Sequence, residues 1–410
     1  MLLNGQPPAD VVAFGPSERR TSVGPWLIRR VLRHLECGRL TILLPSGDRI
    51  EHEGAIAGPH GTISLRDKAA LRRLLTRGDV GFAEGYVAGD WTSPDLTQLI
   101  ALAAENVARL DRTLEGFWPV RLWRKLGHLL KRNSAAGSRR NIAFHYDLGN
   151  DFYRLWLDES MTYSSAMALP PGETLEQAQR AKLDRITQRL TLTGTEDVLE
   201  IGCGWGALAL RLAGDSRSVT GLTLSREQLA HACQQVEARG LADRVQLRLQ
   251  DYRAIDQRFD RIVSIEMLEA VGEAYWPVYF DTLRACLKPG GRIVLQAITI
   301  REDRFSSYKR SPDFIQRYIF PGGMLPTPAI LREQADRAGL VVVASETFGA
   351  GYADTLAEWR RRFDAAWPQI AALGFDTGFR RLWDYYLSYC EAGFRTGTID
   401  VGLYVLEKKA

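Results

Sequence analysis

The feature that most limits the possible folds is an alternation of short β runs with helical segments, which begins at Asp197. Five apolar runs read, in order, DVLEIG, SVTGLTL, RVQLRLQ, FDRIVSIE and GRIVLQAITI, and the later runs GLVVVASE and VGLYVLEK continue the pattern. Strands separated by helices form a mostly parallel sheet, because each crossover helix returns the chain to the same edge. We therefore expect an α/β fold with a seven-stranded, mostly parallel sheet flanked by helices.

The first 115 residues predict a separate and smaller α+β unit, since 410 residues exceed the usual ~100–200 residues of one domain. RLTILLPSGDRIEHEG predicts a hairpin, GTISLRD a further strand and KAALRRLLTRG a helix. In SPDLTQLIALAAENVARL we expect a second helix with Ser93 as N-cap, Pro94 as its first residue and Asp95 in its first turn. The unit has no catalytic constellation, and we interpret it as a scaffold or docking domain.

The cellular compartment is indicated by features that the chain lacks. No apolar run approaches the ~20 residues that cross a bilayer, and the N-terminus does not have the pattern of a signal peptide. The five cysteines include no CxxC pair, which fits neither a disulfide framework nor a structural zinc site. We expect a cytoplasmic protein without a metal.

Residues 116–140 form a basic segment, although the net charge of the whole chain is only +4. Between Val120 and Arg140 there are seven Lys or Arg residues and no acid, interleaved with Trp123 and four leucines. This pattern predicts an amphipathic linker helix that makes peripheral contact with an anionic membrane at its inner face. An interdomain helix with a solvated basic face explains it equally well. No nucleic-acid partner is expected, because the run is short and no known nucleic-acid-binding module is present.

The loop VLEIGCGWGALAL places Gly202, Gly204 and Gly206 between an apolar strand and a helix. Glycines there let a ligand approach the backbone at the carboxyl end of the strand. The spacing differs from the GxGxxG of dinucleotide sites, and Glu200 precedes the loop, where it can accept a hydrogen bond from the amino group of a methionine moiety. The loop therefore favours S-adenosylmethionine over NAD.

Polar residues also follow the next two strands. Thr223, Ser225 and Gln228 come after the second strand, and Asp251 comes after the third, where it can accept from the adenine amino group. Each residue alone is equally well a helix cap or a loop residue. Because the carboxyl ends of parallel strands meet at one edge, together they predict a cofactor site.

The chain resembles the cyclopropane-fatty-acyl-phospholipid synthases and related fatty-acid C-methyltransferases. From Asn141 onward the resemblance is carried by HYDLGNDFYRLWLDESMTYSSA, VLEIGCGWG, GLTLSREQ, DYR, FDRIVSIEMLEAVG, YIFPGGMLP and YCEAGFRTGTIDVGLYVL. It implies a Rossmann-like S-adenosylmethionine-dependent methyltransferase with a helical lid over an acyl tunnel, acting on cis-unsaturated chains of membrane phospholipids. The cofactor contacts that it implies, together with those above, are Tyr163, Ser164, Glu200, Gly202, Cys203, Gly204, Trp205, Gly206, Thr223, Leu224, Ser225, Gln228, Asp251, Tyr252 and Ile265.

The chemistry of that family accounts for the aromatic stretch from Asn141 to Ala166. An alkene is a weak nucleophile, so the activated methyl group must meet it in a dry and oriented pocket. Aromatic faces can stabilise the resulting carbocation without trapping it. We expect part of this wall from aromatic residues of the stretch, some of which are core residues instead: Phe144, Tyr146, Phe152, Tyr153, Trp156 and Tyr163. His145 is interpreted as structural.

The residues that hold the base differ in part from the family pattern. Ring-forming members bind a bicarbonate through a Cys, a Glu, a His and a Tyr. Glu269 and Tyr352 match the Glu and the Tyr, whereas Ser165 and Gln296 replace the Cys and the His. Ala270 also replaces the His of the E-H-x-G motif. Serine and glutamine still donate hydrogen bonds, so the site can hold an anion such as bicarbonate.

Two further carboxylates, Glu159 and Glu266, are candidate bases, the latter where many members have Gly. A buried carboxylate with a raised pKa can itself accept the proton, although Glu159 also suits a helix start. The sequence leaves open a cyclopropane or a methyl- or methylene-branched product, a homodimer, and a partner reductase for a saturated branch. Methylation of a small soluble metabolite and lipid binding without turnover are the alternative functions.

Overall fold

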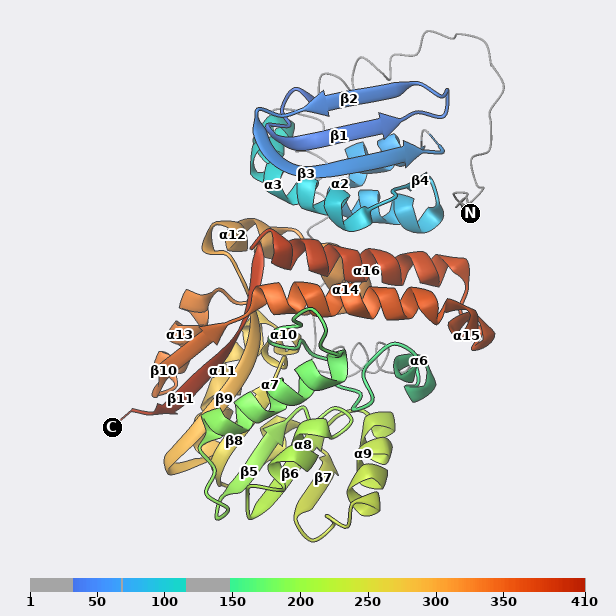
Figure 1. Ribbon diagram of the computed structural model, residues 1–410. Coiled ribbons are helices and arrows are strands. Elements are labelled where there is room, and N and C mark those ends of the chain that lie inside the picture. The colour runs from blue at the N-terminus through green and yellow to red at the C-terminus, as the bar shows by residue number, and fades with distance from the viewer. Residues whose placement is uncertain (1–31, 68, 116–147, 410) are drawn as a thin grey trace.

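The structure, a computed structural model, describes residues 32–67, 69–115 and 148–409 and contains two β-sheets (Figure 1). The smaller sheet has the strand order β2-β1-β3-β4, and the larger has the order β10-β11-β9-β8-β5-β6-β7. The basic segment 116–140, predicted to contact a membrane, lies outside the described residues, as do Phe144, His145 and Tyr146.

The smaller sheet and two helices form the N-terminal unit. Its elements are β1 (Cys37–Leu43), β2 (Arg49–Glu53), β3 (Ile56–Leu65), α2 (Ala69–Ala88), β4 (Trp91–Thr92) and α3 (Leu96–Glu115). The predicted hairpin is confirmed, since β1 and β2 pair antiparallel, and β3 pairs parallel with β1. The helix predicted to end at Gly78 does end there, because Gly78 has φ +60° and ψ −139°, outside the helical region. A second helical segment follows directly and reaches Ala88, so α2 is two helices joined at a kink.

The start of α3 differs from the prediction. The helix begins at Leu96, and Asp95 Oδ1 accepts a hydrogen bond from the Gln98 amide at 3.0 Å, so Asp95 and not Ser93 is the N-cap. The Ser93 hydroxyl accepts instead from the Asp95 amide at 3.3 Å, in the turn before the helix. The prediction of Ser93 as N-cap was therefore wrong by two residues.

The larger sheet confirms the expected seven-stranded architecture. Its strands are β5 (Asp197–Ile201), β6 (Ser218–Thr223), β7 (Val245–Leu249), β8 (Phe259–Ile265), β9 (Leu287–Ile300), β10 (Leu340–Thr347) and β11 (Ile399–Lys408). The pairs β6–β7, β5–β6, β5–β8 and β8–β9 are parallel, whereas β11 runs antiparallel to both β9 and β10. The sheet is therefore mostly parallel, as predicted.

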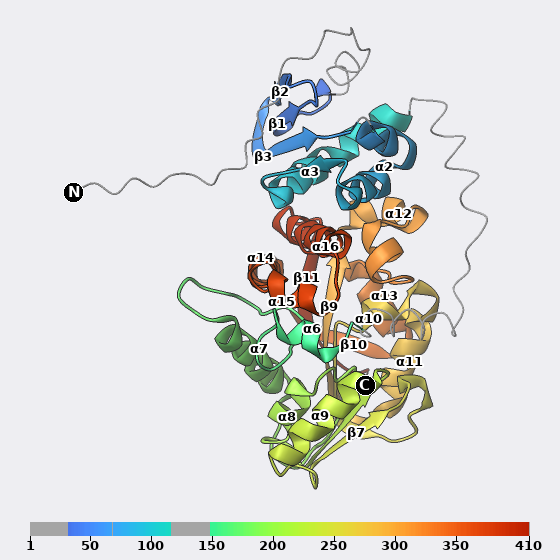
Figure 2. The same ribbon diagram turned by 90° about the vertical axis from the view of Figure 1, so that its right-hand side faces the viewer.

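Helices cover both faces of this sheet (Figure 2). They are α7 (Leu175–Leu190), α8 (Ala207–Leu212), α9 (Arg226–Ala238), α11 (Trp276–Cys286) and α13 (Pro328–Arg337). Successive strand residues point to opposite faces, so Val198 joins a core with Ile186 of α7 and Leu208 of α8, whereas Leu199 joins a second core with Phe280 of α11. The near-continuous apolar strands follow from this burial on both faces.

Two long helices, α14 (Gly349–Ala365) and α16 (Thr377–Arg395), lie side by side across one end of the large sheet, with α15 (Trp367–Ala372) between them in sequence (Figure 1). The N-terminal unit packs on α16, where Tyr86 donates to Asp384 at 2.5 Å and Thr97 donates to Glu391 at 2.9 Å. Shorter elements complete the part of the chain that contains the larger sheet: α6 (Asn150–Arg154), η1 (Tyr252–Ala254), α10 (Leu268–Val271), η2 (Glu273–Tyr275), α12 (Glu302–Arg310) and the π-helix η3 (Ile315–Ile319).

None of the helices in the described ranges combines the length and the hydropathy that a membrane span requires. All five cysteines carry free thiols.

Candidate active site

The glycine loop follows β5, and all three of its glycines have positive φ values, +84° at Gly202, +52° at Gly204 and +91° at Gly206. A Cβ at Gly202 would lie 2.5 Å from Met267 Cγ, and one at Gly206 would lie 3.0 Å from Ala232 Cβ, so close packing requires both glycines. Gly204 differs, because a Cβ there would meet no atom within 4 Å. Its backbone therefore faces open space that a ligand can approach, as expected for a cofactor cradle.

Glu200 lies on β5 just before this loop and is only 3% exposed. Burial raises the pKa of its carboxyl to about 8, while a hydrogen bond from the Ala209 amide lowers it. Its Oε2 is buried and has no hydrogen-bond partner among the described residues. A buried acceptor without a partner has a high desolvation cost, so the position fits the ammonium group of a methionine moiety.

The polar residues that follow β6 are brought together by hydrogen bonds among themselves. Thr223 Oγ1 donates to Gln228 Oε1 at 2.9 Å and accepts from the Ser225 amide at 3.1 Å. Ser225 is the N-cap of α9, and its hydroxyl accepts from the Gln228 amide at 3.3 Å. Leu224, between them, leaves its side chain 36% exposed. The group is pre-ordered at the carboxyl end of the strand.

After β7, the carboxylate of Asp251 already accepts hydrogen bonds from Arg253, which the sequence did not predict. Its two carboxylate oxygens accept from Arg253 Nε at 2.9 Å and Nη2 at 2.6 Å, and the Arg253 amide adds a third bond at 3.0 Å. An adenine amino group at Asp251 would therefore share the carboxylate with Arg253. The neighbouring Tyr252 is buried, which raises its pKa to about 12.

The other residues implied as cofactor contacts lie around the loop. Trp205 Nε1 donates to Asn150 Oδ1 of α6 at 2.7 Å, and the hydroxyls of Tyr163 and Tyr386 are 2.8 Å apart. Cys203 is buried, and burial raises the pKa of its thiol well above the usual range, so it is unreactive. Ile265 is partly buried at the end of β8.

A second cluster forms around Glu266, which follows β8. Its Oε2 accepts from the Tyr352 hydroxyl at 2.7 Å, and its Oε1 accepts from Gln296 Nε2 at 2.7 Å and from the Ser165 amide at 3.3 Å. Gln296 Nε2 also donates to Ser165 Oγ at 3.2 Å. Four candidate catalytic residues from separate parts of the chain therefore converge, with one carboxylate at their centre.

The backbone of Glu266 has φ +51°, a left-handed conformation that favours glycine. For a residue with a side chain it costs on the order of 1 kcal/mol or more. The hydrogen bonds to the carboxylate, together with one from the Glu266 amide to the Gln296 carbonyl at 2.8 Å, hold the residue in place. Strain at a candidate catalytic group is typical of functional sites.

The surroundings of two neighbouring carboxyls, Glu266 and Glu269, affect their pKa values differently. Burial raises the pKa of Glu266, while the Tyr352 hydroxyl, the charge of Lys182, the Ser165 amide and Gln296 lower it. Glu269 accepts a hydrogen bond from the Ile298 amide, and its Oε2 has no partner in the described part of the chain. Burial and the negative charge of Glu266 raise the pKa of Glu269 to about 8. Near pH 7, Glu269 is therefore mostly neutral, and Glu266 has the donors that an anion requires.

Glu159 does not join this cluster. Its side chain is exposed and lines a surface pocket of about 440 Å³ with Arg154, His231 and Arg362. A solvated carboxylate has no means of acting as a base in a dry pocket, so Glu159 is not a candidate base, contrary to the expectation from the sequence.

The sequence analysis missed two polar residues of α7, Gln179 and Lys182. Lys182 is 1% exposed, and its Nζ donates to Ser164 Oγ at 2.6 Å. Gln179 Nε2 donates to the Ser164 carbonyl at 2.8 Å. Both lie at helical spacing on the apolar stripe that includes Leu175, Ala178 and Ile186. A lysine within an apolar stripe was the signal that could have identified them.

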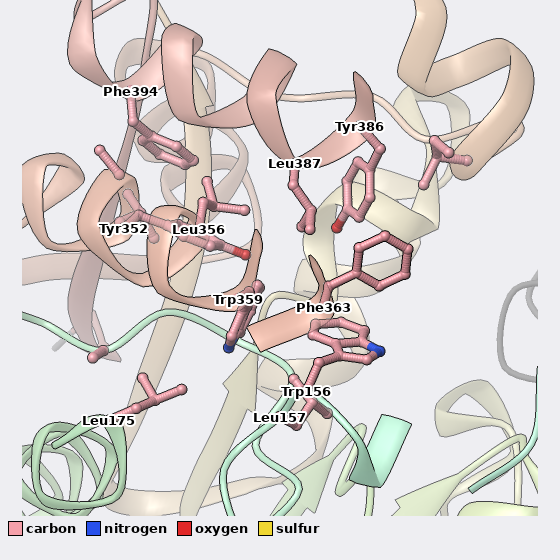
Figure 3. Close-up of a cluster of buried hydrophobic side chains, with 14 of the residues drawn as sticks. Trp156, Leu157, Leu175, Tyr352, Leu356, Trp359, Phe363, Tyr386, Leu387 and Phe394 are labelled. Atoms are coloured by element: carbon pink, nitrogen blue, oxygen red, sulfur yellow. The ribbon is translucent and has the colours of Figure 1, made fainter. Parts of the chain in front are cut away.

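Aromatic side chains, among them Trp156 and Trp359, lie on the same side of the molecule as Tyr352 in a buried hydrophobic cluster (Figure 3). Trp359 has its ring centroid 5.4 Å from that of Tyr163, 5.7 Å from that of Trp156 and 6.2 Å from that of Tyr352. Tyr352 also stacks on Phe394 at 4.4 Å. Phe152 and Tyr153 are fully buried, which is typical of core residues. Trp156 is equally buried, and it and Tyr163 are the members of the predicted wall that contact Trp359, which in turn contacts the tyrosine bound to Glu266.

Comparison with known proteins gives a consistent result. A family model described as mycolic acid cyclopropane synthetase matches residues 133–403. The tuberculostearic acid methyltransferase of Mycobacterium tuberculosis is 42% identical over 351 residues, which is 83% of this chain and 82% of the relative. The cyclopropane-fatty-acyl-phospholipid synthase of Escherichia coli K12 is 35% identical over 347 residues, 84% of this chain and 87% of the relative.

Solved structures agree with these relatives. The cyclopropane synthase MmaA2 from Mycobacterium tuberculosis matches with a TM-score of 0.62 and 32% identity, covering 66% of this chain and 98% of that protein. The mycolic acid cyclopropane synthase CmaA1 complexed with SAH and CTAB matches with the same score and identity, covering 68% and 99%.

Proposed function

Because the chain belongs to the mycolic acid cyclopropane synthetase family, we propose that it methylates the cis double bond of an unsaturated acyl chain in a membrane phospholipid. Its enzyme class is that of the S-adenosylmethionine-dependent lipid methyltransferases. The observation that carries the proposed chemistry is Glu266, a partly buried carboxylate held by three donors beside an aromatic wall. We assign to Glu266 the role of the base.

The residues at the carboxyl ends of β5 and β6 fit the cofactor. When bound, S-adenosylmethionine supplies a methyl group on a positively charged sulfur, which makes that methyl a strong electrophile. Gly204 lets the ligand approach the backbone, and Glu200 accepts from its ammonium group. Thr223 and Gln228 are ordered beside the same edge, where their hydroxyl and amide groups form hydrogen bonds with polar groups of the cofactor.

The aromatic wall and Glu266 act on the acyl chain. Attack of the double bond on the methyl group leaves a positive charge on the neighbouring acyl carbon, which the faces of Tyr163, Trp359 and Tyr352 stabilise. Glu266 then accepts a proton from the methylated chain. Tyr352 and Gln296 keep the carboxylate in place, and Glu269 stays neutral, so it does not compete for that proton.

We propose a methylene-branched chain as the product. A hydride first moves from the methylated carbon to the cationic carbon, and Glu266 takes a proton from the new methyl group. The electron pair of that C–H bond becomes the second bond of C=CH₂. The step balances without a reductant, whereas a saturated branch needs one from another protein. The 42% identity to a tuberculostearic acid methyltransferase, against 35% to a cyclopropane synthase, supports a branched product over ring closure.

Isotope labelling tests this function. We expect the full chain to transfer label from methyl-labelled S-adenosylmethionine to vesicles of dioleoyl phospholipid and to transfer none to vesicles with saturated chains. NMR of the recovered fatty acid should show the two protons of a C=CH₂ branch on the acyl chain. Cyclopropane protons would overturn the proposed product but not the methyl transfer. Binding of both substrates without labelled lipid would indicate a lipid-binding protein, and label on a soluble compound without vesicles would indicate a metabolite methyltransferase.

Cofactor binding should release a proton from Glu200. Its carboxyl, with a pKa of about 8, is mostly neutral at pH 7 before binding, and a nearby ammonium lowers the pKa so that the proton leaves. We expect calorimetry at pH 7 in phosphate and in Tris to report release of about one proton. Glu200→Gln should bind more weakly and release none. Equal heats in the two buffers for the unmodified protein would contradict the contact between Glu200 and the ammonium group.

A further inference from the structure

Lys182 is a buried lysine to which the proposed mechanism gives no role. It lies on α7, 1% exposed, and its Nζ donates to Ser164 Oγ at 2.6 Å. Its charge faces Glu266, which follows β8, and Asp158, in the loop before α7. Its neighbours on the buried stripe of α7 include Ala178 and Ile186. Lys182 therefore places a cationic group at a position of α7 whose neighbours on the buried stripe include apolar residues.

A buried ammonium destabilises a fold unless its surroundings compensate, and the penalty is several kcal/mol. Burial lowers the pKa of Lys182 to about 8, while the charges of Glu266 and Asp158 raise it. The lysine is thus still mostly charged at pH 7. An apolar side chain would fill this helix position at lower cost, so packing alone does not account for a cation here.

Lys182 also acts on the segment that touches Glu266. Together with Gln179, one turn earlier on α7, it binds both the hydroxyl and the carbonyl of Ser164. The next residue, Ser165, donates its amide to Glu266 Oε1 at 3.3 Å. The helix, the Ser164–Ser165 segment and the carboxylate are therefore connected by consecutive hydrogen bonds.

The titratable groups that interact with Glu266 come from four helices. Tyr352 of α14 is kept neutral by a pKa well above the usual range, due to burial and to the charge of Glu266. Glu269 of α10 is a like charge whenever it ionises, and Cys390 of α16 has its pKa raised by burial and by nearby acids that include Glu266. Lys182 is the cation among the groups that act on Glu266 in the described part of the chain.

We propose that Lys182 is a positioning residue for proton transfer. Its ammonium fixes the Ser164–Ser165 segment and supplies the counter-charge that holds Glu266 in the ionised form. The inference rests on the proposed function, because it assigns Lys182 a purpose only if Glu266 is the base. Without the cation, a carboxylate in a dry site beside Glu269 would bind a proton and lose its ability to accept one from the substrate.

A direct titration tests this without depending on activity. Infrared spectroscopy of the full chain can follow the carboxyl band of Glu266 against pH, assigned by its absence in Glu266→Gln. We expect Lys182→Met to move this titration upward by about one to three pH units, since an opposite charge shifts a carboxyl pKa by that much. Lys182→Arg should largely restore it. An unmoved titration in folded Lys182→Met would overturn the proposal.

Two further variants separate charge from structure. Gln179→Leu removes the bond to the Ser164 carbonyl but no charge, so we expect lower thermal stability with the Glu266 titration unmoved. Lys182→Gln keeps a donor for Ser164 and, should Lys182→Met not fold, provides the same neutral test with the same expected shift. If Gln179→Leu moved the titration as far as Lys182→Met, the effect would be structural and the counter-charge role would be excluded.

Kinetics give a second readout. The rate should fall as pH drops through the pKa of Glu266, so the acid limb of kcat should move to higher pH in Lys182→Met, with KM little changed. A limb that stays in place although the titration moves would exclude Glu266 as the base and leave the electrostatic role of Lys182 intact. An unmoved titration in an active Lys182→Met enzyme would exclude the counter-charge role of Lys182 and leave the proposed function intact.

Discussion

Glu266→Gln is expected to lower kcat for lipid methylation by about a thousandfold, within the range of ~10²–10⁴ that a positioned base contributes. The amide keeps the size of the side chain, its single oxygen can accept from Gln296, and its NH2 group can donate to the Tyr352 hydroxyl oxygen, so the site should remain folded. It has no lone pair basic enough to take a proton from the methylated acyl chain. Turnover with dioleoyl phospholipid vesicles measures the loss, and S-adenosylmethionine affinity should be unchanged.

Glu269→Gln is the matched comparison, because it changes the neighbouring carboxyl in the same way. With a pKa raised to about 8 by burial and by Glu266, Glu269 is already mostly neutral at pH 7, and glutamine can accept from the Ile298 amide as the acid does. We expect its kcat to stay within about tenfold of the unmodified enzyme. The reverse order, with Glu269→Gln inactive and Glu266→Gln active, would transfer the role of base to Glu269.

Glu266→Gly tests whether an added anion can replace the lost carboxylate. Removal of the side chain relieves the left-handed backbone at φ +51° and leaves the donors of Ser165, Gln296 and Tyr352 around the space of the lost carboxylate. Added bicarbonate or acetate should then partly restore turnover. Glu266→Gln should not respond, since its amide fills that space. Failure of every small carboxylate to rescue a folded Glu266→Gly would argue against an anion site here.

The arrangement of the catalytic sheet could be predicted because its signals are local. Each strand from β5 to β8 is a short apolar run, and the glycines of the loop directly follow one of them, β5. The helix boundaries in the N-terminal unit were less certain. Either Ser93 or Asp95 can cap α3, and the sequence predicted the helix end at Gly78 but not the second helical segment that begins directly after it.

The organisation of the carboxylate site could not be predicted, because its hydrogen bonds join distant residues. Glu266 is bonded to residues 101, 30 and 86 positions away, namely Ser165, Gln296 and Tyr352. Sequence indicated the members, but not that one carboxylate occupies the centre. Glu159 was included as a further carboxylate that could act as a base if it were buried, yet burial depends on the fold, and this side chain faces solvent. Lys182 was overlooked because a lysine on a helix is usually exposed.

Gly204→Ala is expected to weaken S-adenosylmethionine binding by at least about a hundredfold, or about 2.8 kcal/mol. The glycine has φ +52°, and a Cβ built on it meets no protein atom within 4 Å, so the added methyl group would enter the space through which a ligand reaches the backbone. The fold itself should tolerate the change apart from the strain of a left-handed alanine, on the order of 1 kcal/mol. Calorimetry measures the affinity, and thermal unfolding measures the strain.

Gly240→Ala separates the two effects, because Gly240 has nearly the same backbone, φ +64°, and equally open surroundings. It lies between α9 and β7, at the amino end of the strand, whereas cofactors of such sheets bind at the carboxyl ends. Both alanine variants should therefore lose similar thermal stability, and only Gly204→Ala should lose affinity. If the two variants bound the cofactor equally well, the space at Gly204 would be ordinary solvent, and the cradle would have to be sought elsewhere along the loop.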